Sequence, residues 1–225
     1  MRVYAINGVS LSGKDTFCKM VADQLARELC NDPNMTQVQM IHYYGYKTAV
    51  ISTIDPVKEI YTNFFGWDGT KTPEHRKNLN TLKLIWISAS DGPSNWLRNT
   101  LSELKESDIE MVFVMVREYD EMMNAQNIGM DVCGHAETIQ LVRHGIPIPP
   151  VEQEFLDSHP EHYVYDWTII NPTVDTAPDI PKLQMASKTF IELSKTKTPL
   201  HNPVVWNPID ERFVEWVFKD VELSI

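Results

Sequence analysis

Short apolar runs alternate along the chain with segments in which apolar residues recur every three or four positions. The most continuous run, Met111 to Val116, is typical of a strand buried on both faces of a parallel sheet. Strands separated by helices predict a doubly wound parallel sheet, which is an α/β fold. The expected strands are residues 2–7, 48–54, 111–116, 138–142 and 167–170, and residues 38–44 are also rich in strand-forming side chains.

The segments with helical spacing fall between these strands. One helix is expected to have Asp55 as its N-cap and Pro56 in its first turn, and to stop near Gly66. The helices that follow it, up to about residue 107, are typical of an insertion that covers a substrate. The expected helices are residues 14–29, 55–64, 73–82, 93–101, 151–157, 183–193 and 210–221, with another that starts at 117–121.

Charge and cysteine content narrow the class of protein. The chain has 225 residues, enough for one α/β domain with a full core, and a formal net charge of −11. Such an acidic chain is not expected to bind a nucleic acid polymer, which requires a basic face. Cys18, Cys30 and Cys133 lack the spacing of metal ligands and are expected to be reduced thiols. No run reaches transmembrane length and the chain opens directly on a strand, so we expect a soluble cytoplasmic protein that binds no membrane.

The stretch from Gly8 to Thr16 indicates phosphate binding. Gly8, Gly13 and Lys14 have the spacing G-x-x-x-x-G-K of a phosphate-binding loop, between a strand and a helix. Backbone N–H groups of such a loop surround a phosphate, the positive end of the helix faces it, and Lys14 can reach the β- and γ-phosphates. The expected nucleotide-binding residues are Gly8, Ser10, Ser12, Gly13, Lys14, Asp15 and Thr16.

The loop departs from the usual motif at Asp15, which stands where Ser or Thr is common, while Thr16 carries the hydroxyl. A carboxylate beside a phosphate is unfavourable unless a cation compensates its charge. We therefore expect Asp15 and Thr16 to hold Mg²⁺, directly or through its waters.

Two arginines follow expected strands at the edge where ligands of such sheets bind. Arg117 comes directly after the apolar run that ends at Val116, so its charge needs an anion. That anion could be a phosphate, or a carboxylate of Asp120 or Glu121 in a structural ion pair. Arg143 follows another strand and has the same two interpretations.

Four further residues are candidates for the acceptor side of a phosphoryl transfer. Asp55 could hold the waters of a metal or the hydroxyls of a substrate, or simply cap its helix. Lys58 and Arg76 could contact a substrate phosphate or lie on solvated helix faces. Trp96 could stack on a nucleobase or form part of the apolar cover of the insertion.

These residues resemble those of a known family. The ending Ser-Gly-Lys-Asp-Thr of the loop is similar to that of bacteriophage-type deoxynucleoside monophosphate kinases, and phosphomevalonate kinases of the same P-loop group have a similar Ser-Gly-Lys-Asp loop. The similarity runs through most of the chain but not beyond about Ser194. It includes Ile54 to Glu59, Lys71 to Leu79, Val116 to Glu121, Leu141 to Arg143 and Asp166 to Asn171.

The resemblance implies transfer of the γ-phosphate of ATP, with Mg²⁺, to a (deoxy)nucleoside monophosphate. No general base is required, because the acceptor phosphate is already ionised at neutral pH. By this resemblance, Lys14 would stabilise the transferred phosphoryl group. Arg117 and Arg143 would bind the donor or acceptor phosphates. The acceptor side would contain Asp55, Lys58 and Arg76.

One position departs from the family. The aspartate that precedes the family's valine-arginine pair falls on Met115 here. A carboxylate that might organise the metal is therefore missing, so Asp15, Asp55 or Glu121 must take its place or the activity is weaker.

The resemblance also implies a domain organisation of the P-loop nucleoside triphosphate hydrolase type. A kinase domain would span residues 1–197, with a substrate-covering insertion at about 56–107, and an extension at 198–225 would pack on the same domain. Trp206 and Trp216 of the extension could cover the surface of a second copy in a homodimer. The protein would act in the cytoplasm, that of the host if the chain is viral.

Two other functions remain open. The chain could be a kinase of another small phosphorylated acceptor, such as phosphomevalonate. It could also bind a nucleotide without transferring phosphate, an alternative that Met115 supports best. Against that alternative stand the cations at several strand ends, which the binding of a single nucleotide would not need.

Overall fold

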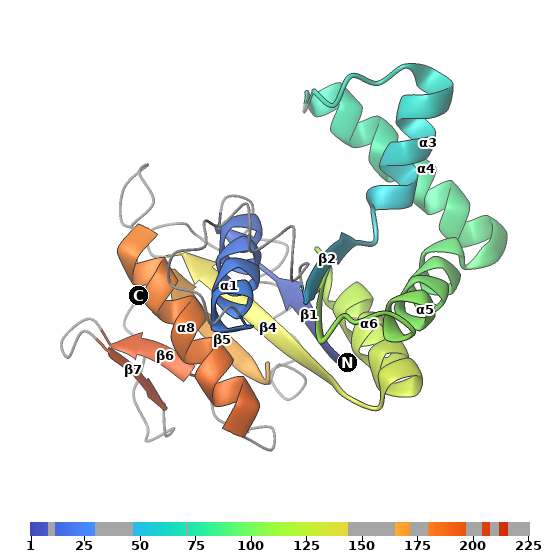
Figure 1. Cartoon of the computed structure of the whole chain (residues 1–225). Helices are drawn as coiled ribbons and strands as arrows, with labels where there is room; N and C mark the ends of the chain where they lie inside the picture. The colour runs from blue at the N-terminus through green and yellow to red at the C-terminus, as the bar shows by residue number, and fades with distance from the viewer. Residues whose placement is uncertain are drawn as a thin grey trace.

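The structure, a computed structural model, contains a sheet of five parallel strands (Figure 1). It describes residues 1–8, 12–29, 47–70, 72–143, 165–171, 180–196, 204–207 and 212–215. The strand order is β2-β3-β1-β4-β5, so the first strand lies at the centre. The strands are β1 (Arg2–Asn7), β2 (Thr48–Ser52), β3 (Met111–Met115), β4 (Ala136–Arg143) and β5 (Trp167–Asn171).

Helices cover both faces of this sheet. Alternate residues of β1 show the two layers. Tyr4 and Ile6 pack against α1 (Lys14–Leu29) and α8 (Ile180–Thr196), while Val3 and Ala5 pack against α5 (Gly92–Lys105) and α6 (Tyr119–Cys133). Burial on both faces explains the continuous apolar runs of β1 and β3. The expected doubly wound parallel α/β fold is confirmed.

The helices between β2 and β3 divide into two groups. Figure 1 shows α3 (Asp55–Phe65) and α4 (Pro73–Ser90) standing away from the sheet, and we call these two helices the arm. The arm is thinly packed: α3 fully buries only Val57 and Tyr61, and α4 has no fully buried side chain. In contrast, α5 places Leu97 and Leu101 in the core beside the sheet. The part of the expected insertion that projects is therefore the arm alone.

Two expectations about local structure are wrong. The helix expected at 210–221 is replaced over Arg212–Glu215 by the strand β7, which pairs antiparallel with β6 (Val204–Asn207). Val205 pairs with Val214 and Trp206 with Phe213 in the backbone register, and β-branched and aromatic residues have a high propensity for strands.

The other error concerns the start of α3. Its N-cap is Ile54, and no side chain caps this end. The carboxylate of Asp55 instead turns back and accepts the N–H of Ser52 at 2.8 Å from Oδ2. The expected strand at 38–44 and helix at 151–157 lie outside the described residues.

Cys18 and Cys133 carry unpaired thiols. Among the described helices, none combines the length and the apolar character needed to cross a membrane.

Candidate functional site

In the loop between β1 and α1, the positions of both motif glycines have no room for a larger residue. A Cβ at Gly8 would lie 2.4 Å from the carbonyl oxygen of Leu141. At Gly13 the backbone has φ +95°, and a Cβ would lie 2.8 Å from Nδ2 of Asn171. Lys14 begins α1, and its Nζ donates a hydrogen bond to the carbonyl of Gly8. The ammonium group is thereby directed back across the loop.

Two buried asparagines support this loop. Oδ1 of Asn7 accepts the N–H of Gly8 at 2.6 Å, and Nδ2 of Asn171 donates to the carbonyl of Ser12 at 2.9 Å. Asn7 ends β1 and Asn171 ends β5, so the loop is fastened to two strands. The hydroxyl of Ser12 is buried and has no hydrogen-bond partner among the described residues. Ser10 lies outside those residues.

The backbones of Arg117 and Arg143 lie at the same edge of the sheet as this loop. The N–H of Val116 donates to the carbonyl of Ile6 at 3.1 Å, which places the following Arg117 beside the end of β1. The side chain of Arg117 is exposed, and its N–H donates to Oε2 of Glu121 at 3.1 Å. Arg143 is the last residue of β4 and lies opposite Asn171 on β5, but its side chain is outside the described part of the structure.

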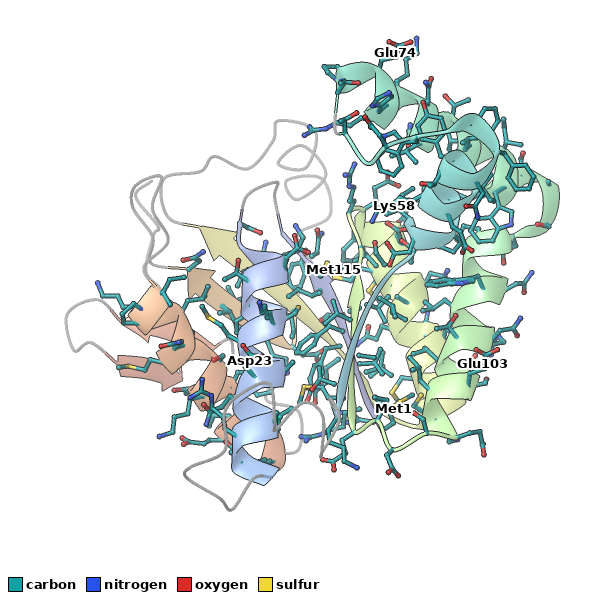
Figure 2. The ribbon with its side chains drawn as sticks, turned by 45° about the horizontal axis from the view of Figure 1, so that its top comes forward. Met1, Asp23, Lys58, Glu74, Glu103 and Met115 are labelled. Carbon is teal, nitrogen blue, oxygen red and sulfur yellow. The ribbon has the colours of Figure 1, made fainter. Side chains whose placement is uncertain are left out.

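The expected acceptor residues are spread along the insertion. Lys58 and Asp55 form a half-exposed ion pair at 2.7 Å in the first turns of α3. Figure 2 shows Lys58 at the base of the arm, above Met115, and Glu74 at the far tip of the arm. Arg76 is exposed in the same first turn of α4 as Glu74, so it lies toward that tip.

Trp96 belongs to α5 and packs, partly buried, against the core cluster around Val3 and Val114. The site therefore combines the loop, Arg117 and the base of the arm at one edge of the sheet.

A buried ion pair at this edge was not predicted from the sequence. Lys83 of α4 lies 2.9 Å from Oε1 of Glu121, and Thr53, in the turn after β2, donates its hydroxyl to the same oxygen. Burial alone would raise the pKa of Glu121, but Lys83, Thr53 and the N–H of Arg117 together lower it. The carboxylate is therefore ionised at neutral pH.

The oxygen donors at the site fit Mg²⁺ bound mainly through phosphates and water. Of the three carboxylates that could replace the family's aspartate, Asp55 and Glu121 each have both oxygens bonded to protein donors. Asp15 is exposed in the first turn of α1, next to the hydroxyl-bearing Thr16. The described residues include no cluster of three or more metal-ligating side chains, and Mg²⁺ bound to a nucleotide does not need one.

A cleft of about 340 Å³ is lined by both Asp15 and Met115. It runs between α1 and β2 and is open on one side. Met115, which stands where the kinases that the sequence resembles have an aspartate, lines the same cleft as Asp15. The lining residues are Asp15, Lys19, Ala22, Thr48, Val50 and Met115.

Comparisons with known proteins identify no family for this chain. No protein-family model matches the sequence, and no curated protein matches it. The structure is similar to APS kinase CysC from Mycobacterium tuberculosis (TM-score 0.41, 10% identity, 87% of this chain and 97% of that one). It is also similar to chloroplast FtsY from Physcomitrella patens (TM-score 0.44, 13% identity, 96% of this chain and 62% of that one). A third similar structure is thymidylate kinase from Ehrlichia chaffeensis (TM-score 0.40, 11% identity, 84% of this chain and 98% of that one). At these TM-scores and identities the similarities support no conclusion about function.

Proposed function

We propose that this chain transfers the γ-phosphate of ATP to a nucleoside or deoxynucleoside monophosphate and releases the diphosphate. One observation carries the proposal: the glycine-lined loop with Lys14 lies at the same sheet edge as Arg117 and the base of the arm, which carries Lys58. Transfer between two phosphates brings several negative charges together, and an acidic chain can catalyse it only with cations concentrated at one place.

The position of each residue would determine its role in the transfer. The loop amides and Lys14 would bind the β- and γ-phosphates of the donor, with Arg117 and Arg143 beside them at the ends of the next strands. Lys58 and Asp55 at the base of the arm, with Arg76 and Trp96 on the insertion, would lie on the acceptor side. Mg²⁺ bound near Asp15 and Thr16 would neutralise charge on the donor phosphates. Positioning and charge neutralisation would be sufficient, because the acceptor phosphate needs no deprotonation.

The proposal is tested by incubating the purified chain with ATP, Mg²⁺ and a panel of acceptors. The panel contains ribo- and deoxynucleoside monophosphates and phosphomevalonate, and products are identified by ³¹P NMR. A diphosphate formed from a nucleoside monophosphate supports the proposal. A product from phosphomevalonate alone would assign the other acceptor class, and ATP binding with no product from any acceptor would contradict a kinase.

Lys14→Met provides the control on the site. We expect turnover to fall about 10²- to 10³-fold, because the variant removes a cation from the transferred phosphate. The free energy of unfolding should stay within about 0.5 kcal/mol of the unmodified protein. The matched variant Arg27→Met removes an exposed charge from the last turn of the same helix and should retain turnover. Equal turnover in the two variants would reject the role of Lys14.

A further inference from the structure

The carboxylate of Glu121 joins three separate segments of the chain. Oε1 accepts from Lys83 in the middle of α4 at 2.9 Å and from the hydroxyl of Thr53 after β2. Oε2 accepts the N–H of Arg117 at 3.1 Å, between β3 and α6. Glu121 lies in the first turn of α6, where a glutamate commonly reaches back to a preceding backbone N–H. Here the same carboxylate also reaches the arm.

The ion pair within this cluster is largely enclosed. A gain in stability does not account for the presence of such a pair. The side chains of Lys83 and Glu121 are only 11% and 12% exposed. Removing two charges from water costs about as much as their attraction returns, so an apolar pair of similar volume would often be equally stable. A buried pair of this kind is better suited to fixing one arrangement of the elements that it joins.

The elements joined here are those that frame the proposed acceptor site. No side chain of α4 is fully buried, so apolar packing alone fixes the position of this helix only weakly. The Lys83–Glu121 pair ties the middle of that helix to the start of α6, while Thr53 ties the base of α3 to the same oxygen. Arg117 is attached through its backbone to the other oxygen. A shift of the arm would therefore change its position relative to Arg117.

We propose that Lys83 and Glu121 are a positioning pair. The pair fixes the arm over the carboxyl ends of β2 and β3 and thereby sets the position of the arm relative to Arg117. Resting on the proposed function, the inference assigns both residues to the binding of the acceptor monophosphate and not of ATP. Neither is a catalytic residue, because both act through the elements that they hold.

The test compares Lys83→Met with Lys77→Met, which removes an exposed charge from the same helix. Amide hydrogen exchange of the full chain without substrates is measured first. In Lys83→Met, amides in the middle of α4 should exchange about tenfold faster than in Lys77→Met. The KM for the acceptor should rise about tenfold in the same variant, while the KM for ATP stays within about twofold.

Two further variants keep the proposal falsifiable if Lys83→Met does not fold. The double variant Lys83→Met, Glu121→Met removes both charges, so no unpaired buried charge remains, and it should fold and show the same rise in acceptor KM. Lys83→Arg keeps the charge and should restore most of the acceptor affinity. The positioning role is wrong if Lys83→Met and Lys77→Met behave alike. It is also wrong if α4 exchanges faster in Lys83→Met with no change in the KM for the acceptor.

This design separates the inference from the proposed function. If the unmodified protein phosphorylates no acceptor, the proposed function fails and the role in acceptor binding fails with it. The exchange measurement would still show whether the pair fixes the arm, since it needs no substrate.

Discussion

Asn171 fastens the loop between β1 and α1 to the end of β5. Its Nδ2 is the donor to the buried carbonyl of Ser12, and it lies against Gly13. In Asn171→Ala we expect the loss of about 1–3 kcal/mol of unfolding free energy, because the carbonyl loses its buried donor. ATP should bind about tenfold more weakly, since the loop must then be ordered by the ligand. Urea unfolding and calorimetric titration with ATP measure the two effects.

Asn80→Ala is the matched control for this change, since Asn80 is exposed on α4. It should alter the unfolding free energy by less than about 0.5 kcal/mol. An ATP affinity that is equal in the two variants would show that the asparagine of β5 has no part in shaping the loop.

Two buried glutamates should give the stability of the protein opposite dependences on pH. The pKa of Glu121 is lowered, because Lys83, Thr53 and the N–H of Arg117 outweigh the effect of burial. Its contribution is present above the unfolded-state pKa of about 4.3 and is lost as the pH falls through the folded-state value. Burial raises the pKa of Glu137, and the indole N–H of Trp167 only partly offsets this. Its contribution is present below about pH 4.3 and is lost as the pH rises through the folded-state value.

Urea unfolding at a series of pH values checks this prediction. The variant Glu121→Gln should lose less stability on acidification than the unmodified protein does. The variant Glu137→Gln should lose less on going from acid to neutral pH. If both substitutions altered the pH dependence of the unfolding free energy in the same direction, the environments assigned to the two glutamates would be wrong.

Sequence patterns predicted the part of the candidate site that depends on local spacing. The spacing of Gly8, Gly13 and Lys14 predicted a strand-loop-helix unit, which the structure has. In contrast, Lys83 and Asn171 act through partners far away in the sequence, Glu121 and Ser12. A lysine on a helix gives no sign of a buried partner, although an asparagine that ends an apolar strand is a weak signal for a polar role at the sheet edge.

At the scale of elements, the period of the apolar residues was sufficient for most of the fold. The strands and the helix α1 lie where the pattern predicts them, because burial on one or two faces leaves a regular spacing. The strand order was not predictable, since it depends on pairing between segments distant in sequence. The error over residues 212–215 has the same origin: a four-residue strand is defined by its partner, β6, and not by its own period.

The whole molecule combines a dense sheet with a thinly packed arm, and this difference should be measurable as two levels of stability. Val3 to Ile6 of β1 are fully buried, whereas α4 has no fully buried side chain. In native-state hydrogen exchange, amides of β1 and β3 should open only with global unfolding, with free energies that fall steeply with urea. Amides in the first turns of α4 should open locally, at a cost lower by about 2 kcal/mol or more and nearly independent of urea.

Under the proposed function, the two levels would let an acceptor that binds under the arm enter without unfolding of the sheet. ATP alone should protect the loop and the start of α1, while ATP with an accepted monophosphate should also slow exchange along α4. A monophosphate that is not an acceptor provides the control, since it should leave α4 unprotected. If α4 and β1 open with one free energy and one urea dependence, the arm is part of the same cooperative unit. Acceptor entry through local opening of the arm would then be wrong.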